Sequence, residues 1–309
     1  MRHKAATQVA KRVAASLEAE RCRLTEGRGV SQSIVNSLTV DVEDYFQVSA
    51  FAPHVNRGEW EAMPCRVEQN VELILQLLND AGAKATFFTL GWIAERYPQL
   101  VRRIMAEGHE LASHGYGHHR ANDQTREHFL ADIQLAKAVL EDVSGQQVQG
   151  YRAPSFSIGP GNTWAFDCIA EAGYTYSSSV YPILHDHYGA PGYPRFAHEV
   201  RSGLLELPVT TVRMFRVNWP AGGGGYFRLL PYPLARWSLR RVNGRERQPA
   251  VFYFHPWELD PEQPRIPAAS ARTRFRHYVN LRHMKRRLQR LLADFRWDRV
   301  DRVFLQGGA

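Results

Sequence analysis

Predicted strands alternate with predicted amphipathic helices along most of the chain, and this alternation restricts the fold more than any other feature of the sequence. Residues 37–42 and 83–90 have the composition of buried strands. Between them, residues 66–80 place apolar side chains on one helical face, namely Val67, Val71, Ile74, Leu75 and Leu78. Further helices are predicted from Pro98, over residues 125–143 and over residues 164–172. Strands that alternate with helices indicate an α/β protein with a largely parallel sheet.

The second half of the chain continues the pattern less regularly. Strands are predicted around residues 148–152, 174–177, 206–209 and 251–258. A run of four glycines, residues 222–225, predicts a flexible loop near a ligand. No glycine-rich motif of a nucleotide-binding protein is present, which disfavours that class of function.

Charge and composition divide the chain into an extension and one domain. Of 309 residues, 44% are hydrophobic, and the net charge is +8 with the excess concentrated toward the two ends. Residues 1–32 predict a basic, poorly ordered extension, and residues 33–309 predict a single domain. A basic helical region is expected at about residues 260–300, with a packed apolar face and a cationic outer face. The aromatic and basic residues do not interleave as in nucleic-acid-binding proteins, so we expect no nucleic-acid partner.

Targeting and cysteine signals indicate a reducing compartment. The chain has no apolar run long enough for a transmembrane helix and no signal-peptide pattern near residue 1. Cys22, Cys65 and Cys168 form no close pair, which argues against a disulfide framework and against a thiolate zinc site. We therefore expect a cytoplasmic location, with a peripheral position at the inner membrane as the alternative.

Polar residues follow the predicted strands at the points where the strands end. Asp41 and Glu43 end the first strand, His114 and His118 follow a later one, and other strand ends carry Arg152 and His255. The carboxyl ends of parallel strands gather on one side of a sheet, where α/β enzymes keep their sites. One carboxylate and two histidines leave coordination positions open, as a catalytic metal requires. The second carboxylate could act as a base, the arginine could hold it, and the last histidine could serve as an acid.

Each of these residues also has a simpler interpretation. A histidine pair at this spacing is more often two surface histidines than a metal site. The acidic stretch around Asp41, Glu43 and Asp44 could be a solvated turn. Asp41 fits that alternative least well, since it directly follows an apolar strand.

The motifs, taken in order, resemble those of a known family. Residues 39–48 read Thr-Val-Asp-Val-Glu-Asp-Tyr-Phe-Gln-Val, residues 114–118 read His-Gly-Tyr-Gly-His, residues 152–156 read Arg-Ala-Pro-Ser-Phe, and residues 252–255 read Phe-Tyr-Phe-His. This pattern resembles the polysaccharide deacetylases of the NodB-homology class, carbohydrate esterase family 4. The nearest resemblance is to the branch associated with exopolysaccharide loci of bacteria that have exosortase (PEP-CTERM) systems. The resemblance extends over about residues 35–300.

The resemblance implies a fold and a reaction. The fold would be a distorted (β/α) barrel with about seven parallel strands. The reaction would be hydrolysis of the N-acetyl group on an amino sugar of a polysaccharide, an oligosaccharide or a precursor of one. A divalent metal, expected to be zinc, would be the cofactor.

The resemblance also implies roles for individual residues. Glu43, His114 and His118 would bind the metal, with Asp44 as the reserve choice for the carboxylate. The catalytic residues would be Asp41 as general base, Arg152 as its support, the backbone N–H of Ser155 at the oxyanion, and His255 as general acid.

Three features differ from the family or allow a second interpretation. Ser155 replaces the usual Tyr, and Ser177 stands where relatives of this branch tend to have Asp. The loss of that Asp predicts a lower activity rather than a different fold. Trp257 and Tyr226 could stack on sugar rings or be ordinary core aromatics.

Two alternative functions follow from the same residues. The site could hydrolyse a small amide, as in allantoinase-like relatives, in which case a closed pocket would replace an open groove. The chain could also be a catalytically impaired carbohydrate-binding protein, for which Ser177 is the support. The sugar, the linkage and the oligomeric state stay open.

Overall fold

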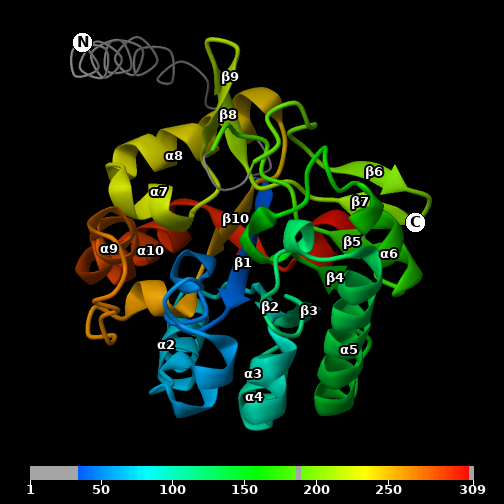
Figure 1. Cartoon of the computed structure of the whole chain (residues 1–309). Helices are drawn as coiled ribbons and strands as arrows, with labels where there is room; N and C mark the ends of the chain where they lie inside the picture. Colours follow the sequence, from blue (N-terminus) through cyan, green and yellow to red (C-terminus); the bar gives the residue numbers. More distant parts are fainter. Residues whose placement is uncertain (1–33, 186–188, 306–309) are drawn as a thin grey trace, which may run out of the picture. The chain divides into compact units, whose positions relative to one another are not determined.

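In the computed structural model, which describes residues 34–185 and 189–305, the predicted strands lie side by side in one sheet (Figure 1). The strand order is β10-β1-β2-β3-β4-β5-β7-β6, and β11 pairs with the start of β1. The strands are β1 (Val35–Val42), β2 (Thr86–Thr89), β3 (Glu110–Ser113), β4 (Gly150–Tyr151), β5 (Tyr176–Ser177), β6 (His198–Arg201), β7 (Leu204–Glu206), β10 (Val251–Phe254) and β11 (Arg296–Asp298).

The pairing confirms the prediction of an α/β fold with a mostly parallel sheet. Strands β10 through β7 in this order are mutually parallel, and β6 at the edge is antiparallel to β7. The order is an open path among the described residues, and backbone hydrogen bonds join β10 at its end to the segments that follow β7 and precede α7. The N–H of Thr210 donates to the carbonyl of Val251 (3.2 Å), and the N–H of Tyr253 donates to the carbonyl of Gly222 (2.8 Å).

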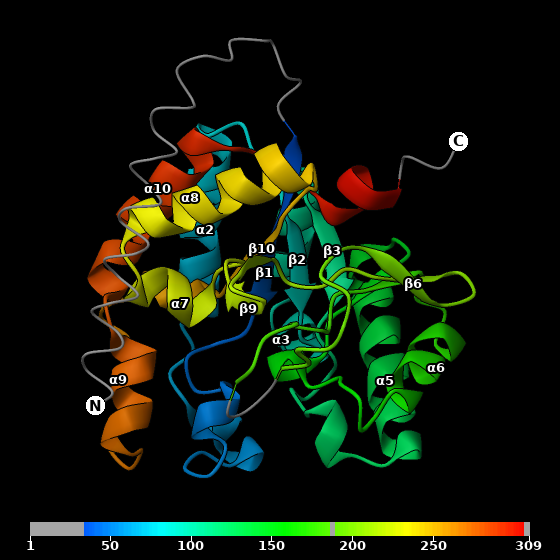
Figure 2. The ribbon, with the colours of Figure 1, turned by 90° about the horizontal axis from the view of Figure 1, so that it is seen from above.

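The helices that pack on the sheet cover one face of it, the face of Val40, Phe87 and Leu111, which are neighbours in register, and Figure 2 shows them around the strands. Apolar side chains of β1, β2 and β10 pack against α2 and α10 in one core cluster, and those around β3 and β4 pack against α5 and α6 in another. The helices are α2 (Val67–Asp80), α3 (Gly91–Arg96), α4 (Pro98–Ala106), α5 (Arg126–Ser144), α6 (Trp164–Glu171), α7 (Gly224–Leu229), α8 (Tyr232–Arg241), α9 (Ala271–Tyr278) and α10 (Leu281–Asp294).

Helix α5 shows why the boundaries fall where they do. The side chain of Thr125 accepts a hydrogen bond from the N–H of His128 and caps the first turn. Gly145 ends the helix with a φ of 67°, a left-handed conformation that glycine adopts readily. The predicted helix over residues 125–143 therefore has its limits set by a local cap and a local stop signal.

The glycine run is packed, which makes the prediction of a flexible loop wrong. Gly222, Gly223 and Gly224 are buried, and Gly223 forms a β-bridge with Tyr253. A Cβ at Gly223 would lie 1.9 Å from the carbonyl oxygen of Tyr253. The glycines therefore allow this segment to approach β10 closely and to start α7.

The basic region predicted near the C-terminus corresponds to α9 and α10. Helix α10 buries Leu281, Met284, Leu288, Leu291 and Leu292 and turns its arginines outward. The predicted extension, residues 1–32, lies outside the described residues. Within the described part of the chain, no helix has the length and the apolar character needed to cross a bilayer.

A second, two-stranded sheet was not predicted. It is a hairpin of β8 (Thr211–Met214) and β9 (Val217–Pro220), inserted between β7 and α7.

Candidate active site

Three side chains with metal-binding groups meet at the carboxyl edge of the sheet. Glu43 directly follows β1, and His114 and His118 follow β3. Their ligand atoms lie within 4.8 Å of one another, and all three side chains are buried. They form the one such group among the residues that the structure describes. The predicted metal ligands are thus brought together from two adjacent parallel strands.

The donor set fits a divalent cation. Oε2 of Glu43 is buried and lies 2.7 Å from Nε2 of His118, yet it makes no hydrogen bond. Nδ1 of His114 donates to the carbonyl of Arg152 (2.8 Å), so the other ring nitrogen is the one available as a ligand. An orphaned carboxylate oxygen among imidazole nitrogens is the arrangement that a bound cation would satisfy.

The ionisation of these groups suits metal binding. Burial lowers the pKa of His114 to about 4, so its ring is neutral at pH 7. Burial opposes ionisation of Glu43, but the nearby rings of His118, His255 and His114 outweigh it and hold the pKa of this carboxyl well below its usual range. Neutral imidazole and ionised carboxylate are the forms that bind metals.

Asp44, the reserve choice for the metal carboxylate, lies outside this group. Its Oδ2 accepts hydrogen bonds from the backbone N–H groups of Arg66 and Val67, and its Oδ1 accepts from the N–H of Tyr45. The first two donors stand at the start of α2, where N–H groups have no partner within the helix. Asp44 therefore caps a helix, and this engagement leaves Glu43 as the carboxylate next to the histidines.

Asp41 is held by Arg152. Nη1 of Arg152 donates to Oδ1 of Asp41 at 2.6 Å and also reaches Oγ1 of Thr39 at 2.7 Å. Both members of the ion pair are buried, so each needs the other as its charge partner. The other edge of the guanidinium donates to the carbonyl and the hydroxyl of Ser178. The arginine is fixed from both sides and holds the aspartate in one orientation.

His255 points its second ring nitrogen at the carboxylates. Its Nε2 lies 3.5 Å from Oε1 of Glu43 and 3.9 Å from Oδ2 of Asp41. Its Nδ1 donates to Oε1 of Glu258 at 2.6 Å. Burial disfavours the charged ring, but the hydrogen bond to Glu258 and the three carboxylates outweigh burial and raise the pKa of His255 to about 9.

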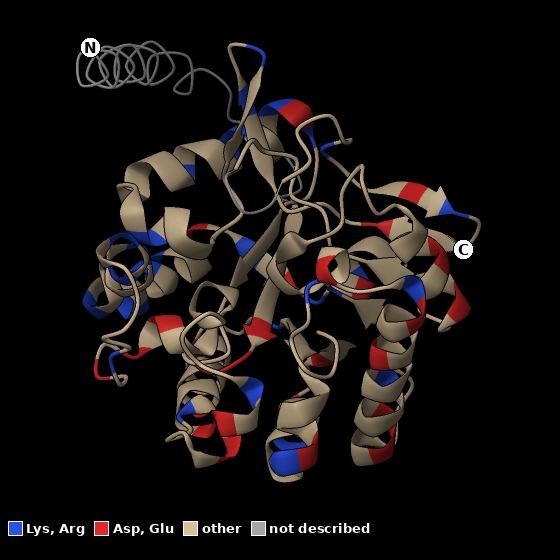
Figure 3. Ribbon diagram, viewed as in Figure 1, with Lys and Arg blue, Asp and Glu red and all other residues tan. Residues whose placement is uncertain are grey.

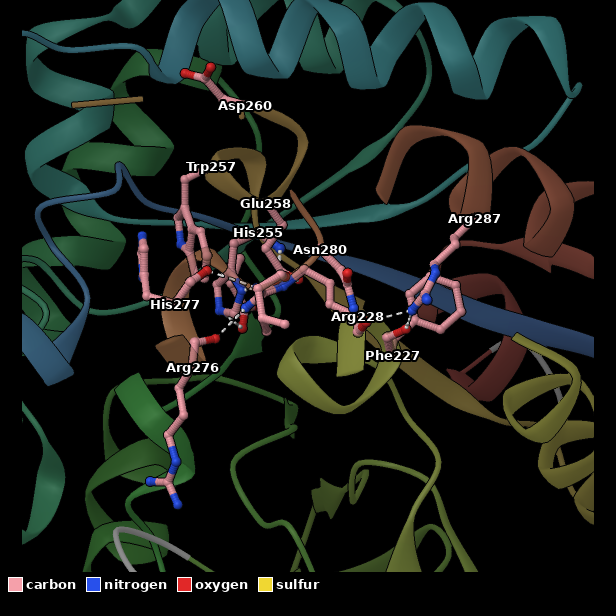
Figure 4. Close-up of polar contacts among 12 residues, drawn as sticks. Phe227, Arg228, His255, Trp257, Glu258, Asp260, Arg276, His277, Asn280 and Arg287 are labelled. Atoms are coloured by element: carbon pink, nitrogen blue, oxygen red, sulfur yellow. Dashed lines mark hydrogen bonds and ion pairs between the residues drawn. The ribbon is translucent and has the colours of Figure 1, made fainter. Parts of the chain in front are cut away.

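Glu258 and Arg228 are two residues that the sequence analysis missed. Oε2 of Glu258 accepts from Nε of Arg228 at 2.7 Å, and Arg228 donates to the backbone carbonyls of His277 and Val279 (Figure 4). Both side chains are almost fully buried. Glu258 stands three residues after His255, a spacing that could have been noticed. Arg228, on α7, carries no local signal that connects it with the site.

Trp257 packs against residues of the site and is not available to stack on a sugar ring. Its ring stacks on His255 and on His277, and its indole N–H donates to Oε1 of Glu43 at 3.2 Å. Only 4% of it is exposed, so the suggestion that it stacks on a sugar is wrong. Tyr226 is partly buried against another aromatic cluster.

Ser155 lies in a strained turn beside the site. It sits within a 3₁₀ turn, Pro154–Phe156, with φ 57° and ψ 26°, and its hydroxyl donates to Oγ of Ser49 at 2.7 Å. Phe156 also has a positive φ, of 49°. Consecutive non-glycine residues in this region are uncommon and mark a backbone that its surroundings hold in place.

The carboxyl group of Glu206 lies close to Ser177, the position at which the resembled branch tends to have Asp. Oγ of Ser177 donates to Oγ of Ser179. Oε1 of Glu206, on β7, accepts from the N–H groups of Ser179 and Val180 at 2.9 Å each. Burial raises the pKa of Glu206, while its hydrogen bonds with the backbone N–H groups of Val180 and Ser179 act in the opposite direction. The layer behind Arg152 therefore keeps a buried carboxylate although Ser177 is not Asp.

A surface hollow of about 370 Å³ starts next to this turn. It is lined in part by Arg120, Phe156, Ser157, Pro160 and Trp164. Phe156 and Ser157 directly follow Ser155, so the hollow extends from the turn that carries the predicted oxyanion donor.

The fold and these contacts define an α/β protein with a candidate metal centre at the carboxyl edge of its sheet. The segment of residues 59–177 matches the family model described as polysaccharide deacetylase. It contains His114, His118, Arg152 and Ser155. Residues 178–305 match a second model, described as a domain of unknown function (DUF3473), and this part contains His255.

Two curated relatives match part of the chain. A peptidoglycan-N-acetylglucosamine deacetylase of Bacillus cereus is 34% identical over 101 residues, which are 33% of this chain and 46% of that protein. A chitooligosaccharide deacetylase of Azorhizobium caulinodans is 32% identical over 82 residues, which are 26% of this chain and 39% of that protein. The chain thus spans less than half the length of either relative.

A solved structure confirms the fold over most of the chain. The crystal structure of a putative polysaccharide deacetylase from Mycobacterium smegmatis has a TM-score of 0.53 and 19% sequence identity. The similarity covers 86% of this chain and 87% of that one, and it extends the shared fold well beyond the segment of the curated matches.

Proposed function

We propose that this chain is a metal-dependent deacetylase that hydrolyses the N-acetyl group of amino sugars in a polysaccharide or its precursor. One observation carries the proposal: the trio of Glu43, His114 and His118, the arginine-held Asp41 and the Nε2 of His255 meet at one edge of the sheet. The match of residues 59–177 to the polysaccharide deacetylase family supports it.

Glu43, His114 and His118 would hold the divalent metal. Three nitrogen and oxygen ligands with further positions open suit a catalytic zinc ion. When bound, such an ion polarises a carbonyl group and makes water more acidic. The chain's own part is to present one ionised carboxylate and two neutral rings, and the pKa values of Glu43 and His114 are shifted in those directions.

Asp41 would act as the base. Arg152 occupies its Oδ1, so Oδ2 is the oxygen that would take the proton from the attacking water. The buried guanidinium also keeps the aspartate from turning toward other partners. Positioning of this kind lowers the entropy cost of the reaction.

His255 would donate a proton to the leaving amine. Its raised pKa, about 9, keeps it protonated at pH 7, and its Nε2 faces the two carboxylates that border the reacting group. The amine of an amide is a poor leaving group unless it is protonated, so a positioned acid is needed. The backbone N–H of Ser155 would stabilise the oxyanion, as the resemblance implies.

The substrate is proposed to be an extended glycan. The turn that carries Ser155 leads into the hollow lined by Phe156 and Ser157, where neighbouring sugar units would be placed. The curated relatives are named for chitooligosaccharide and for peptidoglycan N-acetylglucosamine. The sequence of residues 39–48 supports the finer proposal of an exopolysaccharide substrate in the exosortase-associated branch.

The alternative of a catalytically impaired carbohydrate-binding protein rested on Ser177. It loses support because Glu206 supplies a buried carboxylate next to Ser177.

The test is release of acetate from N-acetylglucosamine oligomers and from peptidoglycan by protein stripped of metal and then restored with zinc. We expect activity only in the restored protein. Asp41→Asn should abolish acetate release while zinc binding persists, whereas His114→Ala should lose both. Wild-type activity in either variant would show that the roles are misassigned.

A further inference from the structure

The β8–β9 hairpin exposes apolar side chains at a place where the fold does not need them. Phe215 is 75% exposed, Val217 51% and Trp219 40%. The hairpin forms its own two-stranded sheet and extends away from the body around the main sheet (Figure 1). Phe215 occupies the turn itself with a φ of 50°. Exposed apolar side chains gathered on one projecting element mark an interaction surface.

The apolar side chains share one face of the hairpin. Met214 pairs with Val217 and Val212 pairs with Trp219, and residues directly opposite in an antiparallel pair point to the same side. The other side is fastened to the body, because Nδ2 of Asn218 donates to the carbonyl of Pro182 at 2.9 Å. On the apolar face Val217 and Trp219 are exposed whereas Val212 is buried, and Arg213 lies on the other face, opposite Asn218.

Arginines are frequent in the segment that contains this hairpin. Residues 211–247 contain eight arginines and a single acidic residue, Glu246. Glu246 pairs with Arg195, which also donates to the carbonyl and hydroxyl of Thr211 at the hairpin base. The base of the hairpin and the π-helical turn Val242–Glu246 are therefore joined. The exposed arginines of the segment are Arg213, Arg216, Arg240, Arg245 and Arg247.

Figure 3 shows the basic colour at the tip and along the hairpin. Arg228 and Arg236 pair with Glu258 and Asp294 from other parts of the chain, so the positive charge of this region comes from its exposed arginines. An anionic partner is the one that this charge would attract.

We propose that the apolar tip of the β8–β9 hairpin and the arginines beside it form a docking surface for an anionic lipid bilayer. Phe215, Val217 and Trp219 suit the boundary between headgroups and acyl chains, and the arginines suit anionic headgroups. An acidic polysaccharide would use hydrogen bonds to polar side chains, which Phe215 and Val217 do not offer. Insertion of apolar side chains and attraction between arginines and anionic headgroups together stabilise reversible binding to a membrane. The proposal does not depend on the deacetylase activity.

The test uses the full chain and sedimentation with vesicles. Vesicles of phosphatidylcholine alone are compared with vesicles containing about one third phosphatidylglycerol. We expect binding to the anionic vesicles that weakens as salt is added. The pair Arg213→Gln and Arg216→Gln should weaken the binding by roughly fivefold for each arginine removed. The pair Phe215→Ser and Val217→Ser should weaken it at least as much, without the added sensitivity to salt.

Matched controls change the same chemistry on other elements. Leu135→Ser, on α5, removes another exposed apolar side chain, and Arg102→Gln with Arg103→Gln, on α4, removes the same charge. These controls should bind as the wild type does, and thermal unfolding should show that every variant is folded.

Three results would overturn the proposal. Hairpin variants that bind as strongly as the controls would place the attraction elsewhere in the chain. A dimer in solution that the hairpin substitutions dissociate would make this face an interface between two copies. Binding to a soluble acidic polysaccharide without binding to vesicles would assign the surface to a glycan.

Discussion

Trp257 contacts both the predicted proton donor and the predicted metal carboxylate. Its ring lies between the imidazoles of His255 and His277, and its N–H donates to Glu43. The ring stack fixes the plane of His255, while Glu258 accepts a hydrogen bond from the proton-bearing Nδ1 and fixes the direction of the ring. Two residues next to His255 in sequence thus determine where its Nε2 points.

Substitution of Glu258 tests this arrangement. Glu258→Gln should lower kcat by about 10²-fold with little change in KM, because the ring of His255 loses its carboxylate partner while the substrate contacts persist. The same change leaves Arg228 buried without a charge partner, which should destabilise the fold by about 3–5 kcal/mol. Steady-state acetate release and urea unfolding measure the two effects.

A double variant separates catalysis from stability. Arg228→Met added to Glu258→Gln removes the unpaired charge, so much of the lost stability should return while kcat stays low. Recovery of kcat together with stability would mean that Glu258 serves only the ion pair and does not act on His255.

At the level of elements, the segment Glu43-Asp44 divides two tasks between neighbouring carboxylates. Glu43 faces the histidines that follow β3, whereas Asp44 turns the other way and accepts the first N–H groups of α2. A single dipeptide therefore joins the candidate metal centre to the start of a helix. The position of α2 and that of the candidate metal site are therefore linked.

Alanine substitutions should separate the two carboxylates. Asp44→Ala should cost about 1–2 kcal/mol of stability, the usual cost of losing a helix cap, and leave zinc stoichiometry unchanged. Glu43→Ala should reduce bound zinc. Denaturant unfolding and elemental analysis of the purified protein are the measurements. Loss of zinc from the Asp44 variant, with full retention in the Glu43 variant, would exchange the two assignments.

At the scale of the whole molecule, Glu110 joins elements that are distant in sequence. The side chains of Thr86 and Tyr176 and the N–H of Asp301 all donate to its carboxyl group. Burial, with the nearby carboxylate of Asp301, raises the pKa of Glu110 to about 7. One buried carboxyl group therefore connects β2, β3, β5 and the chain after β11.

This shift predicts how stability depends on pH. Between the ordinary value of 4.5 and about 7, the folded chain holds the proton of Glu110 and the unfolded chain does not. The contribution of this group to stability should therefore fall as pH rises through that range. Glu110→Gln should remove this part of the slope, as measured by urea unfolding at several pH values. An unchanged slope in the variant would contradict the prediction.

Much of the fold could be predicted from the sequence, because the strands and helices of the sheet have strong local patterns. The helix over residues 66–80 and the strands that end at Val42 and Ser113 are cases in which apolar periodicity and stop signals agree. The bridging of β10 by residues 209–210 and 222–223 could not be predicted, because it depends on contacts between distant segments. The β8–β9 hairpin was missed, since its apolar positions are few and exposed.

The candidate site could be predicted as far as it depends on strand ends. Asp41, Glu43, His114, Arg152 and His255 were found because parallel strands deliver the residues at their ends to one edge. Arg228 was not found, because it reaches the site from α7 and only packing brings it there. The role of Trp257 stayed open, because its sequence position does not reveal that two imidazole rings cover it.

The boundary between the two matched segments falls at residues 177 and 178, between Ser177 and the serine that holds Arg152. A shortened chain that ended at Ser177 would retain the three predicted metal ligands, Glu43, His114 and His118. It would lack His255, the predicted general acid, and the guanidinium of Arg152 would lose its hydrogen bonds to Ser178. Such a fragment would also lose β10, which pairs with β1, the strand that carries Asp41 and leads to Glu43.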